Sequence, residues 1–152
     1  MVGTNDLKLD CISTDDHIRD LYKQYKTKIS LIRQHNKNCK LFVCPVLPTR
    51  SLSINRKVFA FNRYIYDDLV RSNLKVSVVE GFQSFLDYQS NTLSSDTAST
   101  KSGDILHLNK RGTSILVVCI KRAIFGAKTK GGSRIGRRSY SNALRNGPLD
   151  PG

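Results

Sequence analysis

The sequence has no apolar run approaching the roughly 18 to 20 residues that a helix needs to cross a bilayer. It also lacks a signal peptide, because Asn5, Asp6 and Asp10 interrupt every apolar stretch near the first residue. No internal repeat is visible in the 152 residues, a length that suits one domain. These absences predict a protein without a membrane span, and they favour a cytoplasmic location.

Cysteine is scarce, and the four cysteines form no Cys-x-x-Cys pair of the kind that binds zinc. We therefore expect no metal site, and the sequence implies no organic cofactor. Cys44 and Cys119 lie in apolar segments and are predicted to be small buried side chains. Reduced thiols are expected, as is usual inside cells.

Acidic residues are few: 12 stand against 25 lysines and arginines, for a formal net charge of +13. A surplus of this size favours anionic partners such as nucleic acid, acidic membrane surfaces or acidic proteins. Part of it lies in the stretch 127–152, where six basic residues accompany one acidic residue, Asp150, and apolar residues are rare. This stretch is predicted to be a disordered basic tail after a domain over 1–126. Binding of nucleic acid through phosphates and a merely solubilising role are equally compatible with it.

Helix and strand patterns alternate along the domain, which predicts an α/β fold with parallel strands. The last helix is apolar nearly all round and is expected to be well covered. A polar stretch over 89–102 is predicted to be a mobile surface loop. The expected regular elements are a helix from the capping sequence Ser13–Asp16 to the break at Asn36–Asn38, a strand over 41–44, a helix over 55–71, a strand over 74–79 and a helix over 112–125.

An aspartate and a histidine stand three residues apart just before the last helix. At this spacing the Asp104 carboxylate can hold one ring nitrogen of His107 and leave the other free to accept a proton from a hydroxyl nucleophile. Asn109 is the expected cap of the helix that follows, and Gly112 permits close packing in its first turn. The alternative interpretation is a helix-preceding turn with a histidine on the surface.

The block Asp104-x-x-His107-x-Asn109 followed by Gly112 resembles the last conserved block of the SGNH/GDSL hydrolases. Near the first residue, Gly3-Thr4-Asn5-Asp6 resembles the Gly-x-Asn-Asp block of the same family. The resemblance implies ester hydrolysis by a Ser-His-Asp triad, with His107 as general base and Asp104 as its orienting partner. It also implies that Asn5 and Gly3 contribute to the oxyanion hole, and that the substrate is a small ester or an acylated molecule.

The family's nucleophile block, Gly-Asp-Ser, does not occur, since Gly103-Asp104 is followed by Ile105. The resemblance therefore covers only the C-terminal part of such a domain, from Gly3 to about Phe125. It implies an incomplete three-layer flavodoxin-like sandwich that is inactive alone and has an exposed strand edge, which favours self-association. Three serines are expected in loops, but none of them in a strand-to-helix turn next to His107: Ser51, Ser53 and Ser102.

Two further interpretations remain open. One is a non-catalytic binding module on the same fold. The other is a nucleic-acid-associated protein, because SGNH-like esterase domains occur in proteins encoded by some non-LTR retrotransposons. Arg50 is expected in the loop after the first strand, near the active-site cleft of the family. It would serve there as a contact for an anionic substrate or, more simply, as a solvated arginine.

Overall fold

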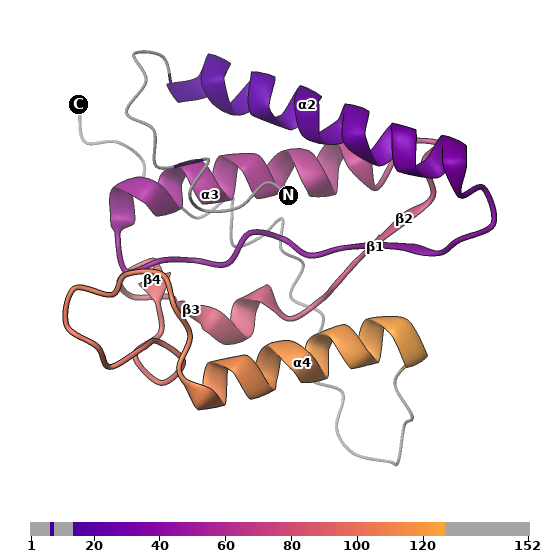
Figure 1. The fold of residues 1–152 in the computed structure, drawn as a ribbon. Helices are drawn as coiled ribbons and strands as arrows, with labels where there is room; N and C mark the ends of the chain where they lie inside the picture. Colours follow the sequence, from indigo (N-terminus) through magenta and orange to yellow (C-terminus); the bar gives the residue numbers. More distant parts are fainter. Residues whose placement is uncertain (1–6, 8–13, 127–152) are drawn as a thin grey trace.

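The computed structural model describes Leu7 and residues 14–126, so that the predicted oxyanion residues Gly3 and Asn5 and the tail 127–152 lie outside the described residues. No described helix is long and apolar enough to cross a membrane. Figure 1 shows the arrangement of the elements, which follow one another in this order: α2 (Thr14–His35), β1 (Leu41–Val43), α3 (Leu52–Tyr64), the π-helical turn η1 (Ile65–Leu69), β2 (Val76–Val78), the 3-10 turn η2 (Phe82–Phe85), β3 (Leu86–Asp87), β4 (Thr92–Leu93) and α4 (Lys110–Phe125).

Strands β1 and β2 pair in parallel, with Leu41 opposite Val76 and Val43 opposite Val78. The chain passes through α3 and η1 between the two strands, as a parallel connection requires. A short antiparallel pair, β3 with β4, forms a separate hairpin. The fold is therefore a mixture of helix and strand with a small parallel sheet, as the alternating pattern predicted at that level.

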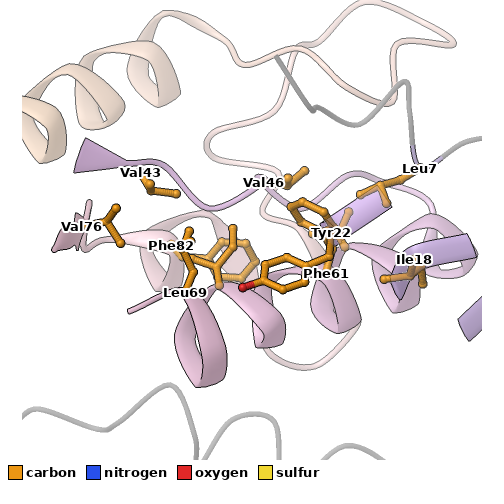
Figure 2. Close-up of a cluster of buried hydrophobic side chains, with 11 residues drawn as sticks. Leu7, Ile18, Tyr22, Val43, Val46, Phe61, Leu69, Val76 and Phe82 are labelled. Carbon is orange, nitrogen blue, oxygen red and sulfur yellow. The ribbon is translucent and has the colours of Figure 1, made fainter. Parts of the chain in front are cut away.

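The main core lies between the sheet and the two helices α2 and α3 (Figure 2). Tyr22 of α2 stacks on Tyr64, with ring centroids 4.9 Å apart, and meets the edge of Phe61 at 6.1 Å. Ile18 and Phe61 are each 1% exposed, so this interface is closed to water. Towards the end of α2, Leu31 and Ile32 are exposed, since they do not pack on this core.

Helix α3 begins earlier than the predicted helix over 55–71. Ser51 caps α3, since its hydroxyl accepts a hydrogen bond from the backbone of Ile54, and the helix starts at Leu52 rather than near Asn55. Its last turn widens into η1, where the Val70 N–H donates to the carbonyl of Ile65 at 3.1 Å.

Helix α4 is capped at its start as predicted, since the Asn109 side chain accepts from the Gly112 N–H at 2.8 Å. Gly126 follows the last residue of the helix with φ 72°. The prediction that α4 is well covered is wrong. Only Gly112 and Cys119 are buried, because the described part of the chain covers one side of a helix that is apolar on every side. Four of its large apolar side chains are exposed: Val117, Val118, Ile124 and Phe125.

The stretch 89–102 is not a mobile surface loop throughout. It contains β4, and Leu93, Thr97 and Ala98 are buried. Leu93 and Ala98 form a second apolar cluster with Phe85, against which the partly buried Ile115 of α4 packs. The polar composition of the stretch predicted a mobile loop, but burial of only three residues is enough to hold the segment in place. Cys44 is exposed, contrary to prediction, whereas Cys119 is buried as predicted.

Candidate functional site

The turn that carries Asp104 and His107 lies immediately before α4 and is held by backbone hydrogen bonds on two sides. The Ser99 N–H donates to the carbonyl of His107 at 2.8 Å, and the Arg50 N–H donates to the carbonyl of Ile105 at 3.0 Å. Ala98 forms a bridge with Leu108, which continues the first of these connections. The turn is thus attached both to the 97–99 segment and to the loop that follows β1.

The side chains of Asp104 and His107 are in contact, as the spacing predicted. The Nδ1 atom of His107 lies 2.9 Å from Oδ1 of Asp104. The same carboxylate oxygen accepts the backbone N–H groups of His107 at 3.0 Å and Leu106 at 3.1 Å. The Asp104 side chain is only 13% exposed, while the imidazole is 80% exposed. A nearly covered carboxylate therefore holds a ring that faces solvent.

These contacts act on the acid–base state of Asp104. The backbone N–H of His107 holds the pKa of the Asp104 carboxyl far below its usual range, and the Leu106 N–H, the imidazole and the Ser99 side chain add to this effect by hydrogen bonding. The carboxylate is therefore ionised at neutral pH and can only accept hydrogen bonds. It follows that Nδ1 of neutral His107 is the donor, and that Nε2 carries the lone pair.

The lowered pKa of Asp104 predicts a dependence of stability on pH. Because the folded-state pKa lies below the unfolded value of about 3.9, the carboxylate stabilises the fold above that pH and loses this contribution as the pH falls below it. Between pH 6 and pH 3 the urea concentration at the midpoint of unfolding should fall by more in the wild-type chain than in Asp104→Asn. Equal declines in the two chains would show that Asp104 does not contribute.

Two buried asparagines of α3 position the loop that supports this turn, and the sequence analysis did not identify them. The Asn62 side chain accepts from the Val46 N–H and donates to the Val46 carbonyl, both at 2.8 Å. The Asn55 side chain makes the same pair of bonds with Thr49, at 2.7 and 2.8 Å. Both asparagines are fully buried. Their seven-residue spacing on the apolar face of α3 was the available signal.

Arg50 has a role that neither earlier interpretation described. Its Nη2 donates to the carbonyl of Ser99 at 2.7 Å, while its backbone N–H binds Ile105. The residue thus links the loop after β1 both to the 97–99 segment and to the turn itself, although its side chain remains exposed. Arg50 is therefore a crosslink between segments of the site.

No nucleophile adjoins the imidazole in the part of the chain that the structure describes. The Ser99 side chain hydrogen-bonds to the Asp104 carboxylate and so helps to orient Asp104. Within the same residues, no group of three side chains could hold a metal ion. Three serines were expected in loops, which is wrong for Ser53, because α3 begins at Leu52 and includes it. None of the three makes a hydrogen bond to His107 among the described residues: Ser51, Ser53 and Ser102.

Comparisons with known proteins give no further guidance. A scan against protein-family models found no match, and searches of curated proteins and of solved structures found none either. The function is therefore inferred from the geometry of the chain itself.

Proposed function

We propose that this chain carries the histidine–aspartate half of an ester-hydrolysing site of the SGNH type, and that it hydrolyses no ester by itself. The observation that supports the proposal is the 2.9 Å contact between Nδ1 of His107 and Oδ1 of Asp104. An ionised aspartate in that position selects the tautomer that leaves Nε2 as a base.

In a site completed by a serine, His107 would take the proton of the attacking hydroxyl and return it to the leaving alkoxide. Asp104 would fix the ring and stabilise the imidazolium. Asn5 and the backbone N–H of Gly3 are the proposed donors to the oxyanion, a contribution typically worth about 3 to 4 kcal/mol. The proposed substrate is a small ester or an acylated molecule, and no cofactor is needed for this chemistry.

The arrangement of the elements supports the proposed incomplete three-layer sandwich. In Figure 1 the parallel strands β1 and β2 lie between α4 on one side and the helices α2 and α3 on the other. The site lies in loops that follow the carboxyl ends of these strands, where open α/β sheets place their ligands.

The tautomer of His107 tests the proposal directly. At a pH where the imidazole is neutral, nitrogen-15 chemical shifts should show that the proton resides on Nδ1 in the wild-type chain. In Asp104→Ala the preference should disappear, because no acceptor remains beside Nδ1. His17 and His35 serve as internal references in the same spectrum. A wild-type ring protonated mainly on Nε2 would refute the assignment of His107 as the base.

Ester turnover tests the second half of the proposal. The purified chain is expected to hydrolyse a short-chain nitrophenyl ester no faster than His107→Ala, because no serine hydroxyl reaches the imidazole in the described residues. Turnover that disappears in His107→Ala would mean that the chain contains its own nucleophile. An in-frame Gly-Asp-Ser segment in the transcript upstream of Met1 would identify the source of the serine that the proposal requires.

A further inference from the structure

A second site lies at the other end of α4. A hollow of about 670 Å³ is bounded by the segments that precede β1 and β2 and by the last turn of α4. His107 precedes the first residue of α4, whereas Phe125 is its last, and a helix of 16 residues is about 24 Å long. The hollow is therefore separate from the Asp104–His107 turn.

The lining of the hollow is strongly basic. Four of its twelve residues are cations, and none is an aspartate or a glutamate: the cations are Arg33, Lys37, Lys40 and Lys75. The Arg33 guanidinium is occupied, since it donates to the carbonyls of Leu74 at 2.8 Å and Cys39 at 2.6 Å. The three lysines make no ion pair among the described residues, so their ammonium groups can bind anions.

The backbone at Lys75 supports a role for the lysines. Lys75 has φ 51°, in the left-handed region that disfavours a residue with a side chain, and its carbonyl is held there by Nη2 of Arg33 at 2.9 Å. A glycine or an asparagine would adopt this conformation with less strain. Lys75 therefore presents its charge to the hollow from a backbone conformation that glycine or asparagine would adopt more easily.

An exposed aromatic ring lies at the rim. Phe125 is 76% exposed at the end of α4, and Ile124 beside it is 47% exposed. An exposed ring next to cations is the combination that binds unpaired bases, because the ring stacks on a base while the cations bind the phosphates. The half-buried Leu41 and Phe42 also line the hollow and supply apolar surface for a base.

We propose that this hollow binds single-stranded nucleic acid, with a base stacked on Phe125 and the backbone phosphates bound by Lys37, Lys40 and Lys75. The net charge of +13 would draw such a strand to the protein from a distance. The proposal does not depend on the hydrolytic function.

The test uses the full 152-residue chain and the fluorescence anisotropy of a labelled oligothymidylate. The variant Lys37→Gln, Lys40→Gln, Lys75→Asn removes three charges, and asparagine tolerates the backbone conformation at position 75. We expect the affinity at 0.1 M salt to fall roughly a hundredfold, and the slope of log K against log salt to become less negative by about 2, since each phosphate contact contributes about 0.7.

The ring is tested separately. Phe125→Ala should weaken binding by roughly fivefold to a hundredfold, the range measured for loss of one base–aromatic stack, with an almost unchanged salt slope. Phe125→Trp should retain binding because it keeps a ring at the same position. Equal losses in the two variants would contradict a stacked base.

The matched control replaces three exposed lysines away from the hollow, Lys28, Lys101 and Lys110, each by glutamine. It should bind nearly as well as the wild-type chain, as should His107→Ala. An equal loss in the lysine control would overturn the proposal, because binding would then depend on net charge alone. Loss only in a tail variant with Arg134, Arg137 and Arg138 replaced by glutamine would also overturn it. The proposal would also be overturned if the triple lysine variant no longer bound anionic phospholipid vesicles but still bound the oligonucleotide.

Discussion

Asn55→Ala should lower the free energy of unfolding by about 3 to 4 kcal/mol, because each buried polar group left without a partner costs about 1 to 3 kcal/mol. The Asn55 amide accepts from the backbone and hydroxyl of Thr49, at 2.7 and 2.9 Å, and donates to the carbonyls of Thr49 and Asn91, both at 2.8 Å. Alanine removes all four bonds in a site that is closed to water. Urea unfolding followed by circular dichroism measures the change.

Two variants make this expectation specific. Asn73→Ala removes an exposed asparagine and should change the free energy of unfolding by less than about 0.5 kcal/mol. Asn55→Asp keeps the acceptor oxygen but loses both donated bonds, and it should destabilise the chain nearly as much as alanine. A loss below about 1 kcal/mol in Asn55→Ala would show that water replaces the amide, contrary to the buried network.

The same substitution should loosen the candidate site. The loop that Asn55 holds continues to Arg50, whose backbone N–H bonds to Ile105 within the Asp104–His107 turn and whose side chain bonds to Ser99. We expect amide hydrogen exchange at Ile105 and His107 to accelerate in Asn55→Ala before global unfolding becomes appreciable. Unchanged exchange there would show that the turn is stabilised by its local contacts alone.

Gly112→Ala should also destabilise the chain strongly, by about 2 to 3 kcal/mol, a cost typical of an overpacked contact. In an exposed helix the same change would be stabilising by about 1 kcal/mol, because alanine favours helix more than glycine does. Here an added Cβ would lie 2.5 Å from the backbone carbonyl oxygen of Thr97 and 3.1 Å from the Cβ of Leu108. A backbone atom cannot rotate away, so the clash decides the sign.

The matched control is Ser114→Ala in the same turn of α4. Ser114 is exposed and its hydroxyl bonds only to the Lys110 carbonyl, so alanine should leave stability unchanged or raise it by a few tenths of a kcal/mol. Thermal unfolding of both variants supplies the comparison. A Gly112→Ala chain as stable as Ser114→Ala would mean that the 97–99 segment moves away from α4 at little cost, and that it does not hold the His107 backbone rigidly.

The predictions that succeeded from the sequence are those that depend on neighbours within one turn. Asp104 and His107 meet because three residues span a single turn, and Asn109 caps α4 through the N–H three residues later. The parallel pairing of the two apolar strands followed from their continuous apolar character and the helix between them. Local backbone geometry brings the groups together in the first two cases. In the third, the helical connection between the two strands requires that they pair in parallel.

The failures concern burial, which depends on partners distant in the chain. The composition of α4 predicted a covered helix, yet Val117, Val118 and Phe125 are exposed because α4 packs along one side only, in part against the small cluster around Phe85. The polar stretch 89–102 concealed the anchors Leu93 and Ala98, whose partners lie outside the stretch. The apolar pattern of a segment does not show how much of its surface the rest of the chain will cover.

By itself the sequence determined the contact between His107 and Asp104 and the Asn109 cap of α4, because short-range geometry decides both, and it determined the parallel pairing of two strands joined through a helix. Only the tertiary structure decided that Asn55 and Asn62 hold the loop beneath the dyad, and that Arg33, Lys37, Lys40 and Lys75 surround one hollow. The physical reason is that hydrogen bonds of buried amides and clusters of charge form between segments separated by many residues. Their free energies depend on packing, and packing is settled only when those segments meet.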